Sequence, residues 1–116
     1  MYAEPPRGKQ SHRRKEILMI RDFSKVLTGL DGQPLKDGDK EIPLSVVCVN
    51  ALRGVYRGEE DLSGVEKEKR YKLCERIYEQ GEVEISIEEL ALIKNLVGKG
   101  YPVDIVGPAY ALLESE

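Results

Sequence analysis

Residues 86–100, SIEELALIKNLVGKG, determine more of the expected fold than any other stretch of the chain. They open with a capping box, in which the Ser86 hydroxyl accepts the backbone N–H of Glu89 and the Glu89 carboxylate accepts the N–H of Ser86. Apolar side chains then recur at spacings of three and four residues, and two glycines end the run. The stretch is therefore predicted to be an amphipathic helix. Its apolar positions are Leu90, Ile93, Leu96 and Val97.

The residues before this helix carry the same kind of signal. Ser63 and Glu66 form another capping box, which predicts the start of a helix. This helix is expected to run to Gln80 and to end on Gly81 in a left-handed conformation. Residues 82–85, EVEI, alternate charged and apolar side chains and predict a short strand between the two helices. The apolar stripe of the earlier helix is expected to consist of Tyr71, Cys74, Ile77 and Tyr78, with Glu66, Lys67, Lys69, Arg70 and Arg76 facing solvent.

Further outward, two more helices and some turn signals complete the pattern. Residues 45–52 are apolar on nearly every face, which is typical of a buried helix, and Ser45 is placed to cap it. Residues 103–113, VDIVGPAYALL, predict a last helix that is interrupted or kinked at Gly107 and Pro108. The Asp-Gly pair in residues 30–35, LDGQPL, permits the positive φ of a tight turn. Residues 41–44, EIPL, predict an extended piece at a sheet edge, because Pro43 cannot donate to a ladder.

These elements together predict the class of fold. We expect an α+β fold, a small and mostly helical single domain with about four helices and a short β-hairpin or edge strands near its start. The length of 116 residues fits one domain with one core.

The first eighteen residues differ in charge from the rest. Residues 1–18 carry five Lys/Arg and two acids, a net charge of +3, whereas residues 19–116 carry a net charge of −6. Residues 13–16, RRKE, permit a purine-rich codon run of the kind found in ribosome-binding sites, which makes Met19 a candidate initiator. Residues 1–18 are therefore expected to be a disordered basic leader or a mis-assigned start, and residues 19–116 a single globular domain.

Candidate catalytic and metal-binding residues are scarce. His12, the single histidine, lies in the leader, so histidine chemistry within the domain is excluded. The acids of residues 59–61 are interpreted as exposed loop charge that favours the N-terminus of the next helix. Cys48 and Cys74 lie among aliphatic neighbours and are expected to be buried and reduced. We therefore expect no enzyme activity, no cofactor, no metal and a cytoplasmic location, and no apolar run is long enough to span a membrane.

The aromatic residues favour protein binding. Six tyrosines stand against one phenylalanine and no tryptophan. We expect Tyr56, Tyr101 and Tyr110 to line a site for an unidentified protein partner, because tyrosine is enriched at interfaces. The alternative for each is a place at the rim of the core. Nucleic acid is a less favoured partner that would be bound through Arg13, Arg14 and Lys15, since the acidic domain repels phosphate. The oligomeric state is left open.

The order of several segments is shared with one group of proteins. The segments are residues 30–35, 49–52, 77–78, 82–86, 91–94 and 106–114, which are spread over most of residues 19–116. In this order the chain resembles small uncharacterised proteins encoded in tailed-phage and prophage genomes. The resemblance implies a bacterial or phage cytoplasmic origin and transfers no site. It leads us to expect a non-enzymatic accessory protein that acts through protein-protein interaction, with an assembly or chaperone-like role.

Overall fold

The computed structural model of the chain describes residues 18–78 and 81–115. These residues form four helices, one two-stranded antiparallel sheet and a small hairpin, which confirms the predicted α+β class. The predicted leader lies outside the described residues, except that Leu18 belongs to the first strand. The elements are β1 (Leu18–Asp22), β2 (Lys36–Asp37), β3 (Lys40–Glu41), α2 (Leu44–Arg53), α3 (Gly64–Tyr78), β4 (Glu82–Ser86), α4 (Ile87–Gly100) and α5 (Val103–Glu114).

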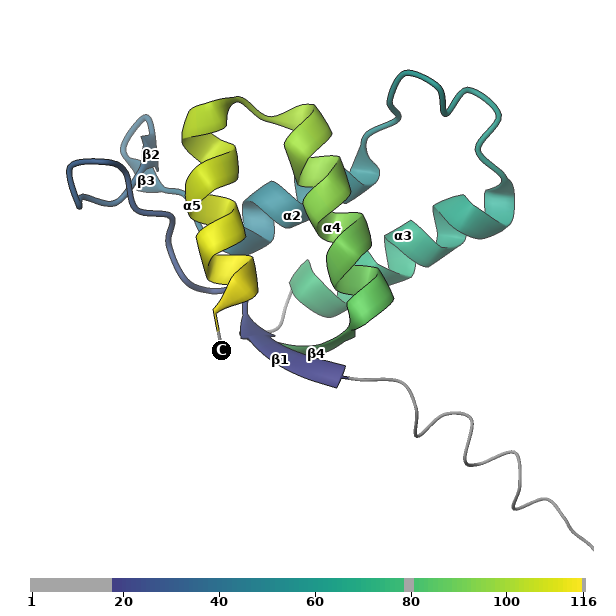
Figure 1. Cartoon of the computed structure of the whole chain (residues 1–116), viewed down its shortest axis with the longest axis horizontal. Coiled ribbons are helices and arrows are strands. Elements are labelled where there is room, and N and C mark those ends of the chain that lie inside the picture. The colour runs from purple at the N-terminus through teal and green to yellow at the C-terminus, as the bar shows by residue number, and fades with distance from the viewer. Residues whose placement is uncertain (1–17, 79–80, 116) are drawn as a thin grey trace, which may run out of the picture.

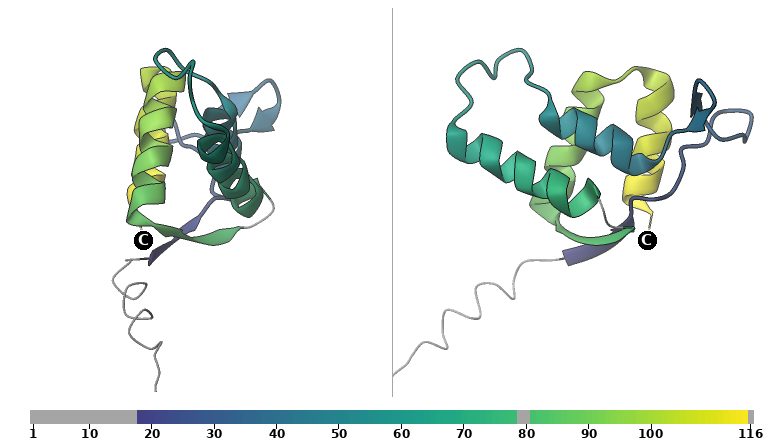
Figure 2. Two further views of the ribbon diagram at one scale, coloured as in Figure 1. Left: turned by 90° about the vertical axis from the view of Figure 1, so that its right-hand side faces the viewer. Right: turned by 180° about the vertical axis from the view of Figure 1, so that it is seen from behind.

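The helices lie in two layers. α4 and α5 stand side by side in one layer, and α2 and α3 lie behind them in the other (Figures 1 and 2). The β1–β4 sheet closes one end of the two layers, and the β2–β3 hairpin projects beside α5. The face formed by α2 and α3 is thus left uncovered on its outer side, as the view from behind shows (Figure 2, right).

The sheet joins the first described segment to a strand far along the sequence. β1 pairs antiparallel with β4, from Leu18 opposite Ser86 to Asp22 opposite Glu82. The predicted strand over residues 82–85 is therefore confirmed. Buried Arg21 extends from β1 to the end of α5, where its Nε donates to the carbonyl oxygen of Leu113. This bond satisfies a carbonyl that a helix C-terminus leaves without an intrahelical partner.

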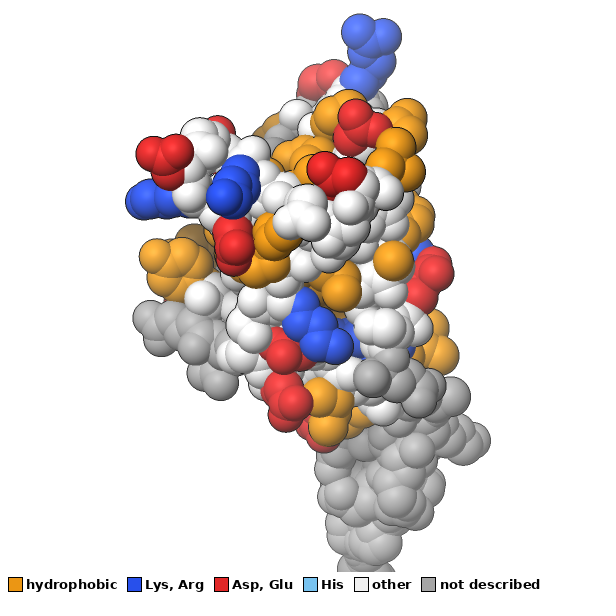
Figure 3. Space-filling model, turned by 90° about the vertical axis from the view of Figure 1, so that its left-hand side faces the viewer, with side chains coloured by type: hydrophobic (Ala, Val, Ile, Leu, Met, Phe, Trp, Pro, Cys, Tyr) orange, Lys and Arg blue, Asp and Glu red, His pale blue; other side chains and the backbone are white. Residues whose placement is uncertain are grey.

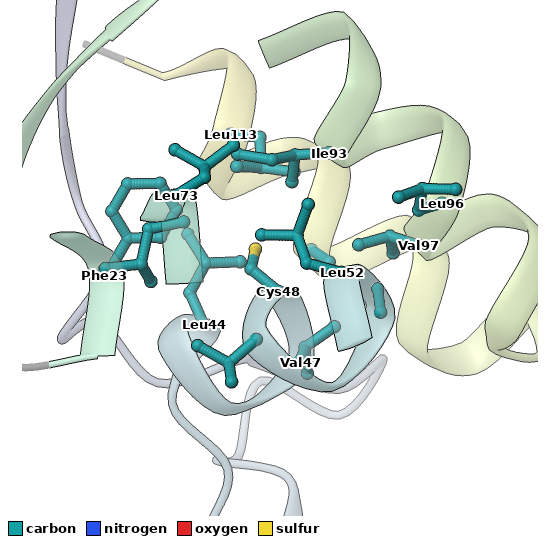
Figure 4. Close-up of a cluster of buried hydrophobic side chains, with 14 of the residues drawn as sticks. Phe23, Leu44, Val47, Cys48, Leu52, Leu73, Ile93, Leu96, Val97 and Leu113 are labelled. Carbon is teal, nitrogen blue, oxygen red and sulfur yellow. The ribbon is translucent and has the colours of Figure 1, made fainter. Parts of the chain in front are cut away.

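The core forms where α2 lies between the other elements. α2 contacts α3, α4 and α5, and most of its side chains are buried, as its apolar sequence predicts. Figure 4 shows side chains from all four helices and from the segment after β1 meeting around Cys48. The labelled members of this core are Phe23, Leu44, Val47, Cys48, Leu52, Leu73, Ile93, Leu96, Val97 and Leu113.

The capping box at Ser86 is confirmed. The Ser86 hydroxyl accepts the N–H of Glu89 at 3.1 Å, and the Glu89 carboxylate accepts the N–H of Ser86 at 2.9 Å. At the start of α3 the Ser63 hydroxyl accepts the N–H of Glu66 at 3.1 Å. The reverse bond, from the N–H of Ser63 to the Glu66 carboxylate, does not form within the described residues. The position of the two serines before their helices is thus read correctly from sequence.

The structure corrects two local predictions, at the start of α2 and in the middle of α5. α2 begins at Leu44 after Pro43 and has no side-chain cap, so Ser45 is not its cap. The left-handed conformation expected of Gly81 depends on residue 80, which lies outside the described residues, so it stays a prediction. α5 continues through Pro108, so the helix is not interrupted there, and the alternative of a kink stays a prediction. The predicted end of α3 at Gln80 lies outside the described residues.

Candidate functional site

A groove runs between α2 and α3 on the uncovered face of the molecule. α2 contributes Val49 and Arg53, which are four residues apart. α3 contributes residues 71, 74, 75 and 78, which follow the spacing of one helical face. Together these residues line a depression of about 480 Å³. We call this depression and its extension described below the α2–α3 groove.

The walls of this groove are exposed tyrosines and its floor is buried. Tyr71 and Tyr78 are 62% and 72% exposed, whereas Val49 and Cys74 beneath them are buried. Tyrosine rings carry an apolar face and a hydroxyl that stays hydrated, which is why they are common where proteins bind one another. The groove therefore offers two large amphipathic side chains over an apolar base.

A second depression of about 330 Å³ extends the groove toward the loop of residues 54–63. It shares Arg53, Tyr71 and Cys74 with the first. Its other lining residues are Leu52, Gly54, Val55, Leu62, Lys67 and Arg70. Three of the residues that line it are cations, and none is a carboxylate. The groove thus has a basic end beside the loop and an end with two tyrosines.

The loop is fixed by an ion pair between buried Arg70 and partly buried Glu59. Arg70 donates to both carboxylate oxygens of Glu59, from Nη1 at 3.0 Å and from Nη2 at 2.8 Å. The side chains of the two residues are 7% and 14% exposed. This guanidinium, together with the N–H of Tyr56, lowers the pKa of Glu59 to about 2. The loop is thereby held against α3 as a wall of the groove.

The buried stripe of α3 agrees with the expected one only in part: Cys74 and Ile77 are buried as predicted, and the other two expected positions are exposed. The buried positions are Arg70, Leu73, Cys74 and Ile77, so the expectation that Arg70 faces solvent and that Tyr71 and Tyr78 face the core is wrong. Both stripes have helical spacing, and the choice between them depends on whether an arginine is allowed inside. The signal that favours the observed stripe is the acidic loop that precedes the helix, which was interpreted as exposed.

The three tyrosines predicted to bind a partner lie elsewhere. The Tyr56 hydroxyl donates to the carbonyl of Ala51 at 2.7 Å, and the Tyr110 hydroxyl donates to the carbonyl of Lys94. Both rings, and that of Tyr101, are half-buried against the core. None of the three lines the α2–α3 groove. Their role in partner binding stays a prediction, and the exposed pair Tyr71 and Tyr78 is the one that sequence reasoning missed.

Gly98 and Gly100, near the end of α4, allow the hydroxyls of Tyr110 and Tyr56 to lie close to the helix. A Cβ at Gly98 would lie 2.8 Å from the Tyr110 hydroxyl, and one at Gly100 would lie 3.0 Å from the Tyr56 hydroxyl. Any larger residue at these positions would push the tyrosines away. The two rings therefore belong to the internal packing of the domain.

Both cysteines are free and buried, as predicted. Burial raises the pKa of the Cys48 thiol to about 12 and raises that of Cys74 as well, although Arg53 acts against the second shift. Cys74 also donates weakly to the carbonyl of Val49 at 3.8 Å. Cys74 at the floor of the groove is consequently a protonated thiol at neutral pH.

Another hollow lies on a different side of the molecule. Residues 28–35 and the first half of α5 enclose about 690 Å³, with Leu30 and Val103 exposed at its edge. Figure 3 shows that hydrophobic and charged side chains are intermixed over this side. It lacks the aromatic walls and the segregated charge of the α2–α3 groove.

The described residues contain neither a metal-binding cluster nor a helix that could span a membrane. In residues 18–78 and 81–115 no group of three or more His, Cys, Asp or Glu side chains is placed to hold a metal ion. Within the same ranges no helix has both the length and the apolarity needed to cross a membrane. Arg13, Arg14 and Lys15 lie outside these ranges, so a role for them with nucleic acid stays a prediction.

Comparison of the chain with protein-family models, with curated proteins and with solved structures gives no match.

Proposed function

We propose that this chain is a non-enzymatic protein-binding module that holds a segment of another protein in the α2–α3 groove. The observation that carries the proposal is the exposure of Tyr71 and Tyr78 above buried Val49 and Cys74. Covering two such rings removes apolar surface from water, and their hydroxyls remain available at the edge of an interface.

The state of Cys74 supports binding over chemistry in this groove. A cysteine nucleophile needs a lowered pKa, and the pKa of this thiol is raised by burial. Arg53 and Glu75 are the charged groups beside it in the first depression. These residues supply recognition by charge and shape.

The setting of this function rests on the resemblance described above. Under that resemblance the module is a cytoplasmic accessory protein of a phage or prophage, with an assembly or chaperone-like role. Two free, buried cysteines are compatible with a reducing compartment.

Site-specific photo-crosslinking tests the proposal. The full chain is produced in its native host with benzoylphenylalanine in place of Tyr78, or in place of Glu88, which is exposed on α4. We expect one discrete adduct from position 78 and none from position 88. The partner from that adduct, once purified, should bind the wild-type chain and lose at least tenfold in affinity with Tyr71→Ser/Tyr78→Ser. Equal crosslinking from both positions, or unchanged affinity, would contradict the proposal.

A further inference from the structure

The partner's chemistry can be taken one step further, on the basis of the proposed function. We infer that the segment bound in the α2–α3 groove is an acidic, apolar peptide. Its carboxylates lie at the basic end near Arg53 and Lys67, and its apolar side chains lie over Tyr71 and Tyr78.

The first support is the uneven charge of the groove. The depression beside the loop is lined by Arg53, Lys67 and Arg70 and by no carboxylate. The charge of Arg70 is offset by Glu59. Arg53 and Lys67 are exposed, and neither forms an ion pair within the described residues. Two cations thus face this end of the groove, although residues 19–116 carry a net charge of −6.

The second support is that the two cations in the C-terminal half of α3 already have carboxylate neighbours, whereas Lys69, which is exposed in the first half, lines neither depression. Lys72 lies 3.9 Å from Glu68, and Arg76 lies 2.7 Å from Glu89. An acidic segment is therefore drawn to the loop end of α3 and not to its C-terminal half. There Glu75, which lines the groove between the two tyrosines, repels a further carboxylate.

The third support is the length of the site. Lys67 and Tyr78 are eleven positions apart on α3, which corresponds to roughly 16 Å along the helix axis. An extended segment of about five residues covers that distance. A short acidic and apolar motif is thus long enough to reach the basic end and both tyrosines at once.

Charge complementarity also distinguishes this peptide from nucleic acid. Two cations on an acidic domain give a weak, strongly salt-dependent attraction for phosphate. A peptide carboxylate gains the same attraction and adds apolar contacts over the groove, which salt does not screen. We therefore take an acidic peptide as the occupant, and oligonucleotide binding in the groove becomes an outcome that would overturn the inference.

The experiment selects peptides on the full chain and then reverses the charge of the groove. A random library of displayed 12-residue peptides is panned against the wild type, against Arg53→Glu/Lys67→Glu and against Tyr71→Ser/Tyr78→Ser. A control variant, Lys36→Glu/Lys69→Glu, has the same change in net charge at exposed positions outside the groove. Circular dichroism checks that each variant is folded, and Arg53→Gln/Lys67→Gln replaces the reversal if that variant unfolds.

We expect the wild type and the control to enrich peptides rich in Asp or Glu with aliphatic or aromatic neighbours. The reversed groove should instead enrich Lys or Arg, and a synthetic acidic peptide should bind it at least tenfold more weakly than the control. Peptides that depend on the two tyrosines but show no acidic preference, or keep their affinity after reversal, would overturn this inference and leave the proposed function standing. No enrichment that depends on the tyrosines would overturn both. Oligonucleotide binding that is lost on reversal would also overturn the inference.

Discussion

Arg70 and Glu59 meet through two parallel hydrogen bonds, 3.0 and 2.8 Å long, that fasten the loop of residues 54–63 to the first half of α3. The Nε of Arg70 is buried and has no acceptor within the described residues. The guanidinium therefore depends on Glu59 for its only ion-pair partner in that part of the chain. Since the loop forms one wall of the α2–α3 groove, the ion pair links the stability of the domain to the shape of this groove.

Removing one member of this pair should destabilise the domain. Glu59→Ala leaves the Arg70 charge buried without a partner, and we expect a loss of about 2–4 kcal/mol in the free energy of unfolding. The double variant Glu59→Ala/Arg70→Leu should lose less unfolding free energy than the two single variants lose in sum, because no buried charge remains. Urea denaturation of the four proteins measures the coupling. Strictly additive losses would show that the pair is not an energetic unit.

The same pair predicts a dependence of stability on pH. Arg70 holds the pKa of Glu59 at about 2, below its ordinary value of 4.5. The contribution of the ionised carboxylate is therefore complete above about pH 4.5 and is lost as the pH falls toward 2. The difference in unfolding free energy between the wild type and Glu59→Gln should shrink over this interval. A difference that stays constant from pH 7 to pH 3 would contradict the assignment. Comparison with Glu59→Gln is needed because Arg76 lowers the pKa of Glu89 as well.

The two capping serines should differ in their effect. Ser86 is buried and makes both bonds of its box, whereas Ser63 is exposed and makes one. We expect Ser86→Ala to cost about 1–2 kcal/mol and Ser63→Ala about 0.5–1 kcal/mol. Denaturant midpoints measured for the two variants show which serine contributes more to stability. A larger effect at Ser63 would indicate that its glutamate completes the box in solution.

Thiol reactivity tests the floor of the groove. Both cysteines are buried and both thiols have a raised pKa, to about 12 for Cys48. Alkylation at pH 8 should be more than about a hundredfold slower in the folded than in the unfolded protein. Cys74 should react before Cys48, because it lines the groove. An acidic peptide bound there should slow Cys74 further, as peptide mapping by mass spectrometry can show. Faster alkylation of Cys48 would contradict this order.

A separate measurement addresses the basic N-terminal residues. Any affinity of the chain for DNA or RNA is expected to come from these residues, to be weak and to fall steeply with added salt. Arg13→Gln/Arg14→Gln/Lys15→Gln in the full chain should abolish it, while binding of a groove peptide is unchanged. Titrations at low and physiological salt compare the variant with the wild type. Binding that resists salt and survives the substitutions would favour a regulator of nucleic acid instead.

Features set by neighbouring residues could be predicted from the sequence, and features set by distant ones could not. The box at Ser86 and the helix after it involve residues a few positions apart. β4 was found from its alternation, but its partner β1 is fixed by tertiary contacts that alternation does not encode. The stripe of α3 has the expected period and the wrong phase. A shift of one residue turns a helix by about 100°, which moved the tyrosines from the expected core to the surface.

The candidate site was missed for the same reason. Residues 59–61 are three consecutive acids, and nothing in their sequence indicates which of them reaches an arginine eleven positions later. Once Glu59 neutralises Arg70, the arginine stem can lie inside and its neighbour Tyr71 turns outward. Which face of α3 is exposed in the groove thus depends on one carboxylate in a loop.

The pairing of β1 with β4 also has a consequence for the order of folding. β1 is the first described element to be synthesised, yet its hydrogen-bond partner follows α3, and the carbonyl that Arg21 reaches lies at the end of α5. Contacts between residues so far apart in sequence require closure of a long loop, which slows folding. On the ribosome, the backbone of β1 therefore stays unpaired until β4 has emerged, and Arg21 reaches its acceptor only when the end of α5 has followed. During that interval the unpaired N–H and C=O groups of β1 are open to pairing with another chain, which a chaperone bound to the nascent strand would prevent.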